Sequence, residues 1–232
     1  MLQAGLRISN QWGSVQIDQN WRNYGFRQKV PVTITAYGTG EPIGYGGYQY
    51  QLVLSGTPAL RVACRATELL PVKMHSYFNG STWFLNWLFL KWLPPVADGS
   101  EAIPVTETVQ FYVFDVLDFG TFSNVGLRVF NPSMQLVFHS DAPMMKLGYS
   151  GAGVQGCNIP FLGGPGRSYV PLILRNPIHG HGVGGVGYRI ASHCLRVSGS
   201  TIITDDRQVR SLGASDAYEN VGAYAAIDVT GL

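Results

Sequence analysis

The chain has 232 residues, of which 46% are hydrophobic and only 13% are charged, and its formal net charge is +2. This composition excludes a disordered chain, which needs low hydrophobicity and high net charge, and a coiled coil, whose heptads need charged flanks. It also excludes a DNA-binding protein that relies on clustered basic residues, since no run of Lys and Arg occurs. The 29 glycines and the 12% aromatic content indicate a β-rich protein with long loops.

The three cysteines, Cys64, Cys157 and Cys194, are widely spaced and form no C-x-x-C pair. This pattern predicts free thiols in a protein made in a reducing cytosol, rather than a disulfide framework. The first ten residues have neither a basic n-region nor an apolar h-region, so we expect no secretory signal there. The most apolar stretch, residues 83–96, is shorter than the roughly 20 residues that a membrane-spanning helix needs. We therefore expect no membrane span.

Alternation of apolar and polar residues predicts strands over residues 30–37, 48–54 and 105–114. Residues 83–92 fit either a short helix or a strand, because periodicity cannot decide so short an apolar run. Toward the end of the sequence, residues 194–204 are typical of a hairpin around a glycine turn.

A Gly-rich region extends over residues 148–187 and predicts long loops, which are usually functional in compact domains. The apolar insert at residues 169–174 predicts at least one strand inside this region. A last strand is predicted over residues 223–229.

An internal repeat aligns residues 5–10 (GLRISN) with residues 126–131 (GLRVFN), without gaps. Residues 15–17 then match residues 136–138, so the same hairpin is predicted twice. Duplication of a small β domain is one interpretation, and chance recurrence of a hairpin signature in an all-β chain is the other. We expect an all-β, antiparallel, sandwich-like fold that is either one domain or two related halves.

The two halves would be residues 1–121, which begin with the GLRI hairpin, and residues 122–232, which contain the GLRV hairpin and the Gly-rich loops.

Residues 111–115 (FYVFD), 125–131 (VGLRVFN) and 135–141 (QLVFHSD) resemble small structural proteins encoded near the tail tip and tail fibres of tailed bacteriophages. The opening residues 5–23 are similar to the start of such proteins. The shared pattern is an aromatic-rich strand followed by a hairpin of the form G-L-x-V-[FY]-[ND]-x-x-G-x-L-V-F-D-S. The chain departs from it at Met134, where the turn usually has Gly, and at His139, where Asp is usual. The resemblance implies a β-rich virion component that is synthesised in the host cytoplasm and has no known catalytic residues.

Enzymatic motifs are weak in this sequence. The letters G-x-G-x-x-G occur at residues 151–156, but the strand before and the helix after that a nucleotide site needs are not predicted. The 14 acidic residues offer no assignable pair for glycoside hydrolysis. We therefore expect a protein that is not an enzyme and that binds no nucleic acid.

His179 and His181 are the sharpest chemical feature, because residues two apart in an extended chain point to the same side. In a trimer, three such pairs could hold iron or zinc on the threefold axis, an arrangement that resembles some phage spike and fibre tips. Two exposed histidines in a Gly-rich loop is the simpler interpretation, since one His-x-His alone supplies too few ligands.

Two groups of residues are candidates for binding. Trp83, Trp87 and Trp92 are typical of a core or a subunit interface, and a ligand patch is the alternative. Tyr149, Arg167 and Tyr169 belong to the Gly-rich region, which either contacts a receptor or wraps a neighbouring subunit.

The sequence thus predicts a non-enzymatic virion protein of the tail tip or fibre assembly that works by protein–protein binding, with a homotrimer as the expected oligomer. The alternative is a receptor-binding adhesin that contacts the host surface through residues 148–187. A polysaccharide hydrolase is a third hypothesis.

Overall fold

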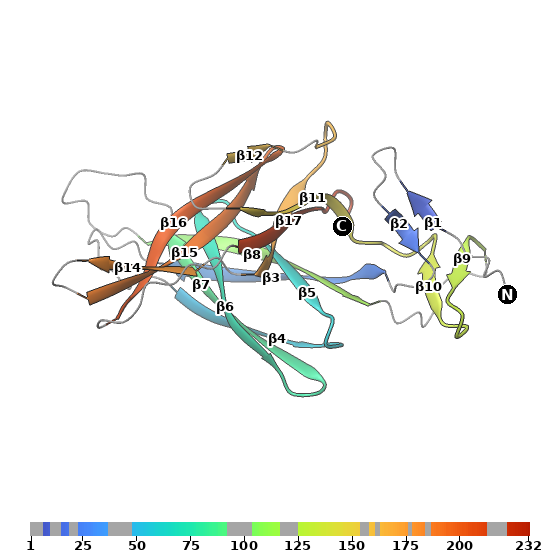
Figure 1. The fold of residues 1–232 in the computed structure, drawn as a ribbon, viewed down its shortest axis with the longest axis horizontal. Helices are drawn as coiled ribbons and strands as arrows, with labels where there is room; N and C mark the ends of the chain where they lie inside the picture. The colour runs from blue at the N-terminus through green and yellow to red at the C-terminus, as the bar shows by residue number, and fades with distance from the viewer. Residues whose placement is uncertain are drawn as a thin grey trace.

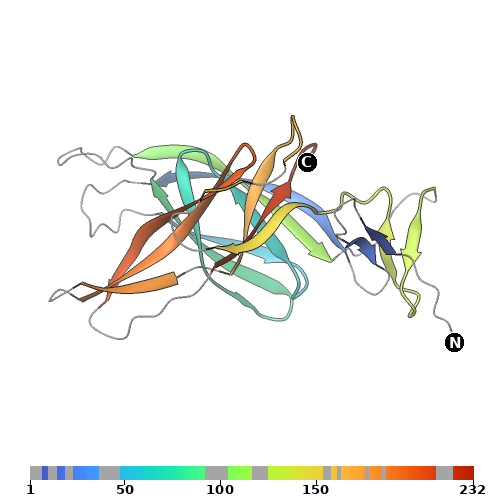
Figure 2. The same cartoon turned by 45° about the horizontal axis from the view of Figure 1, so that its top comes forward.

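The computed structural model of the chain is built from strands, turns and loops, and no helix occurs among the residues that it describes. All strand pairings in this part of the chain are antiparallel, so the predicted all-β class is confirmed. Figures 1 and 2 show an elongated molecule, with a body of long strands and a small group of short strands at one end. The described residues are 7–9, 15–18, 23–36, 48–91, 104–116, 125–153, 158–160, 163–175, 178–183, 187–212 and 222–232.

The short strands at the end of the molecule form two hairpins. Strands β1 (Arg7–Ser9) and β2 (Val15–Asp18) pair with each other, as do β9 (Arg128–Phe130) and β10 (Leu136–His139). These four strands, which we call the hairpin module, lie side by side in both views (Figures 1 and 2). They are the two repeated segments that the sequence predicts as hairpins.

The entry to the second hairpin needs a glycine. Gly126 has a φ of +127°, and a Cβ at this position would collide with the hydroxyl oxygen of Ser140. The backbone N–H of Leu127 donates to Ser140 Oγ at 3.1 Å, and the N–H of Ser140 donates to the Leu127 carbonyl at 3.0 Å. The glycine and the serine at the two ends of the hairpin pattern therefore meet in space and close the hairpin.

The turn of this hairpin begins at Asn131, whose carbonyl accepts the N–H of Met134 at 2.9 Å. The side-chain Oδ1 of Asn131 accepts the N–H of Gln135 at 2.8 Å. Met134 has a φ of 59°, in the left-handed region that costs a residue with a Cβ about 1–2 kcal/mol. The Gly-to-Met departure seen in the sequence thus falls on the only non-glycine residue with positive φ in the described part of the chain.

The first part of the body contains two three-stranded sheets. Sheet I has the order β3-β8-β5, and sheet II has the order β4-β7-β6. Their strands are β3 (Tyr24–Ala36), β8 (Val105–Val116), β5 (Arg61–Arg65), β4 (Tyr48–Ser55), β7 (Thr82–Lys91) and β6 (Leu69–Phe78).

The two sheets share one hydrophobic core, in which alternate residues of both face each other. Trp87 and Phe89 of β7 meet Phe111 of β8, with ring centroids 5.4 and 6.2 Å apart. Large aromatic side chains of this kind dominate the energetics of a core. Residues 83–92, which the sequence leaves open between helix and strand, are a strand over Thr82–Lys91, because β7 pairs with β4 on one side and β6 on the other.

The second part of the body contains sheet III, with the order β11-β17-β13, and sheet IV, with the order β12-β16-β15-β14. Their strands are β11 (Lys146–Gly153), β17 (Gly222–Asp228), β13 (Tyr169–Arg175), β12 (Asn158–Pro160), β16 (Thr201–Leu212), β15 (Gly187–Ser198) and β14 (Ile178–Val183). The Gly-rich region of residues 148–187 therefore contains the strand predicted at 169–174, as β13, together with β12, β14 and most of β11.

Sheets I and III together form a ring of strands. On one side β5 lies against β13, and Arg65 Nη1 donates to Ser168 Oγ across this seam at 3.1 Å. On the other side residues 143–145, which we call the strap, pair with the start of β3. The N–H of Phe26 donates to the Pro143 carbonyl at 2.7 Å, and the N–H of Met145 donates to the Tyr24 carbonyl at 2.8 Å.

The interior of the ring is a second hydrophobic core, to which both sheets contribute. Its buried members are Ala63, Tyr112, Phe114, Val170, Leu172, Ala225, Ile227 and Val229. Strand β3 serves both cores because a β-bulge at Arg27 shifts its register, so that Phe26 faces the ring and Ile34 faces the core between sheets I and II.

Each of the sheets and hairpins joins strands from only one of the two predicted halves, residues 1–121 or 122–232. Both hydrophobic cores nevertheless combine side chains from the two halves. The division at residue 121 therefore stays a prediction.

Candidate functional site

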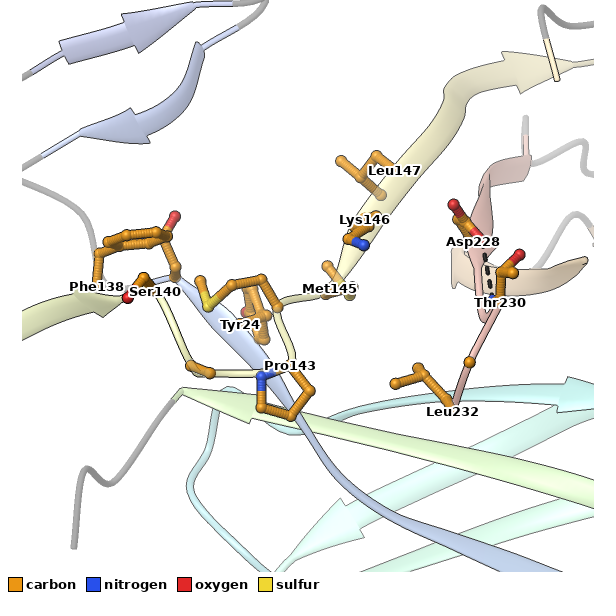
Figure 3. Close-up of a pocket in the computed structure, with 14 residues that line it drawn as sticks. Tyr24, Phe138, Ser140, Pro143, Met145, Lys146, Leu147, Asp228, Thr230 and Leu232 are labelled. Carbon is orange, nitrogen blue, oxygen red and sulfur yellow. Dashed lines mark hydrogen bonds between the residues drawn. The ribbon is translucent and has the colours of Figure 1, made fainter. Parts of the chain in front are cut away.

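A cleft of about 670 Å³ lies where the second hairpin, the strap and the end of β17 meet. This size lies within the range of ligand pockets, roughly 300–1,000 Å³. In Figure 3, Tyr24, Phe138 and Pro143 lie on one side of the cleft, and Asp228, Thr230 and Leu232 lie on the other. The cleft has no counterpart in the sequence motifs, because its walls come from segments far apart in the chain.

One wall of the cleft is fixed by backbone contacts. Asn23 Nδ2 donates to the Val137 carbonyl at 2.9 Å, which ties the start of β3 to the second hairpin. The strap bonds to Tyr24 and Phe26 hold the next residues of this wall. Hydrogen-bonded strands therefore support the cleft on this side, as a preformed site requires.

The opposite wall carries charge. Asp228 Oδ2 accepts from Arg167 Nη1 at 3.0 Å, and Asp228 Oδ1 accepts the N–H of Thr230 at 2.9 Å. Burial alone would raise the pKa of Asp228, but the hydrogen bonds from Thr230 and the charges of Arg167 and Lys146 outweigh it and hold the pKa below its usual value. Asp228 is therefore a carboxylate at neutral pH, and Lys146 lies opposite it in the ladder of β11 and β17.

Exposed apolar side chains are concentrated in the segment that contains the second hairpin and the start of β11. Among residues whose side chains are described, five of the nine large hydrophobic residues that are exposed lie between residues 125 and 147. They are Val125 (80% exposed), Leu127 (48%), Phe130 (43%), Met134 (77%) and Leu147 (57%). Apolar surface of this kind is typical of sites that bind another protein.

The buried acidic residue Asp115 is held by hydrogen bonds rather than free to react. It accepts from Arg27 Nη1 at 3.1 Å, from the Thr57 N–H at 2.9 Å and from Thr57 Oγ1 at 2.5 Å. The carboxylate of Glu107 likewise accepts the backbone N–H groups of residues 67–69, at 2.6–3.2 Å. Both groups anchor the loops that precede or follow β5.

The predicted tryptophan group is divided by the structure. Trp87 is 1% exposed and belongs to the core between sheets I and II. Trp83 is half-buried against the same core, and its Nε1 donates to the Thr57 carbonyl at 2.7 Å. Trp92 lies outside the described residues.

The predicted loop residues also take different positions. Tyr149 and Tyr169 pack against the edge of the core between sheets I and II, and the Tyr169 hydroxyl accepts the N–H of Gly164 at 3.0 Å. Arg167 is exposed, and with Tyr169 it borders a second cleft, of about 370 Å³, at the seam of β5 and β13. A binding role for these residues stays a prediction.

His179 and His181 are both in strand β14, at the edge of sheet IV, opposite Ala191 and Arg189 of β15. Their side chains are outside the described part of the structure. Where side chains are described, no three His, Cys, Asp or Glu residues come together as a metal site. The metal at the histidine pair stays a prediction.

Searches for related proteins return no matching family model, curated protein or solved structure. Within the described residues, no helix is long and apolar enough to cross a membrane.

Proposed function

We propose that the chain is a non-enzymatic structural protein of a bacteriophage tail tip or fibre assembly, located in the virion and acting by protein–protein binding. The phage assignment rests on the resemblance of residues 5–23 and 111–141. The observation that supports a binding role is the set of exposed apolar side chains on the second hairpin. Where exposed apolar side chains form a contiguous patch, that patch marks a site that binds another molecule.

Complementation of a phage that lacks its own copy of the gene tests this proposal. We expect the wild-type chain in purified particles and, by antibody labelling, at the end of the tail. Replacing Leu127 and Met134 together with Ser should prevent incorporation while the circular dichroism of the purified chain stays unchanged. The matched control replaces Val53 and Tyr77, which are 51% and 49% exposed on sheet II, and should be incorporated normally.

A chain that is absent from particles would refute the virion assignment. Equal incorporation of both double variants would instead refute the role of the hairpin surface.

The adhesin hypothesis has one observation in its favour, because exposed Arg167 borders the second cleft. Under this hypothesis, Arg167→Ala yields complete particles that no longer adsorb to the host. Under the structural hypothesis, the same particles adsorb normally. Light scattering combined with metal analysis of the purified chain tests the proposed trimer and the ion at His179 and His181.

A further inference from the structure

The two parts of the body have the same strand topology. In sheet I the central strand is the last in sequence, β8, with β3 and β5 beside it, and in sheet III the last strand, β17, lies between β11 and β13. Sheet II has the order β4-β7-β6, and sheet IV has the matching order β12-β16-β15 with β14 added at its edge. Together with the two hairpins, every strand of the first part has a counterpart in the second, in the same chain order.

The loops that enter β5 and β13 are built alike. Each contains a turn with proline in its second position, Thr57-Pro-Ala-Leu60 and Gly164-Pro-Gly-Arg167. The N–H of Leu60 donates to the Thr57 carbonyl at 3.1 Å, and the N–H of Arg167 donates to the Gly164 carbonyl at 3.3 Å. In both parts this loop begins a side strand of the three-stranded sheet.

An aspartate near the end of each central strand holds the same loop. Asp115 of β8 accepts two hydrogen bonds from Thr57, and Asp228 of β17 accepts one from Arg167. Strand β3 places Gly25 opposite Asp115, and β11 places Lys146 opposite Asp228. This alignment makes Gly25 and Lys146 equivalent at a spacing of 121 residues, the same spacing as in the repeated hairpin sequences.

The hairpins β6–β7 and β15–β16 also match. Both turn on the letters Gly-Ser-Thr, at residues 80–82 and 199–201. Gly80 has a φ of +99° and Gly199 a φ of +58°. The same residue type therefore supplies the left-handed backbone at the same point of both units.

The contacts between the two parts join equivalent elements. The start of β3 pairs with the strap that leads into β11, β5 lies against β13, and β6 lies against β15. The hairpins β1–β2 and β9–β10 lie side by side (Figures 1 and 2). Contacts of each element with its own counterpart are the property of an interface with twofold symmetry.

We propose that the chain consists of two tandem copies of one β-unit, related by an internal twofold axis. The edges of β3 and β5 in the first copy form a surface whose partner is the second copy. The ring interior shows how the two copies have diverged. Tyr112 and Phe114 on β8 correspond to the smaller Ala225 and Ile227 on β17, so large side chains face small ones across the ring. This proposal is independent of the function proposed above.

Circular permutation of the whole chain tests the proposal. Residues 117–127 connect β8 to β9, and a direct peptide bond from Leu232 to Met1 would connect β17 to β1 through a segment of nearly the same length, residues 229–232 and 1–6. A twofold arrangement makes these two connections equivalent. The permutant opened between residues 121 and 122 should therefore fold without any added spacer.

The readouts are the mass by light scattering, the thermal midpoint, and hydrogen exchange of the β8 and β17 amides. We expect a permutant with the wild-type mass and protected amides in both strands. Its thermal midpoint should lie within about 5 °C of the wild-type value. A matched permutant with ten Gly and Ser residues at the joint should be no more stable. The proposal is overturned if only the spacer version folds, or if neither permutant folds.

Discussion

Replacing Asp115 with Ala gives the most direct test of how the body is held together. The carboxylate is 1% exposed and fastens Arg27 of β3 and the loop at Thr57 to the end of β8. Loss of one partner in a buried polar cluster costs the desolvation of the groups that remain, typically about 1.5–3 kcal/mol for each bond to a charged group. Two bonds come from Thr57, so at the lower end of this range the loop alone accounts for about 3 kcal/mol.

The bond from Arg27 adds less, because its side chain is 47% exposed and water replaces the lost carboxylate. An exposed ion pair is worth roughly 1 kcal/mol or less. We therefore expect Asp115→Ala to lower the free energy of unfolding by about 3–4 kcal/mol. Urea titration followed by tryptophan fluorescence measures this change, with Asp115→Asn as a version that keeps the side-chain shape.

The matched control is Asp228→Ala. Its arginine partner lies at 3.0 Å, against 3.1 Å for Asp115, and is equally exposed at 47%. Asp228 is 9% exposed, and its partners are the exposed Arg167 and the nearby Thr230, so we expect a smaller loss, of about 1–2 kcal/mol. Equal losses for the two variants would refute the argument that the Thr57 bonds and the burial of Asp115 carry the difference.

Three further predictions follow from single residues. Met134→Gly should be more stable than Met134→Ala by about 1 kcal/mol, because only Gly adopts positive φ without strain. Hydrogen exchange of the hairpin amides measures this difference, and the Gly and Ala variants of Ser133, where φ is not positive, should show the opposite order. Burial, with a smaller effect from Glu107, raises the pKa of the Cys64 thiol, so in a variant with Ser at both other cysteines the folded protein should resist a thiol reagent at pH 8 and the unfolded protein should react. A native chain that reacts as fast as the unfolded one would contradict this burial. Because the pKa of Asp228 is lowered in the folded state, its contribution to stability is present above the unfolded pKa of about 4 and is lost as the pH falls through the folded value, so the difference between wild type and Asp228→Asn should vanish in acid.

The strands with β-branched and aromatic alternation could be predicted from the sequence. Residues 105–114 lie within β8 (Val105–Val116), and the repeated segments are the two hairpins. The strand β6 (Leu69–Phe78) was missed because a register shift between Lys73 and Ser76 breaks its alternation. The glycines in β11 and β14 interrupt the alternation of apolar and polar residues, so the sequence predicts mainly loops for the Gly-rich region.

The cleft could not be predicted, because its walls join Asn23, residues 138–147 and the segment after β17 only through the closed ring. The departure at Met134 argues against this turn in the sequence, yet the turn forms with Met134 at a positive φ. The topological match of the two parts was visible in the sequence only as a short hairpin repeat. The two parts have the same order of strand pairing although few of their residues match.

Closure of the ring has a consequence for how the protein folds. Every ladder within a sheet joins strands of one half, whereas the seams at β5–β13 and at the strap join residues more than 100 positions apart. Contacts that close such long loops form last, because the chain loses the entropy of loop closure before those contacts compensate for it. During that interval the bare edges of β3, β5 and β13 are open to another chain. We therefore expect the yield of refolded monomer to fall as protein concentration rises, with dimers formed when two chains close each other's rings.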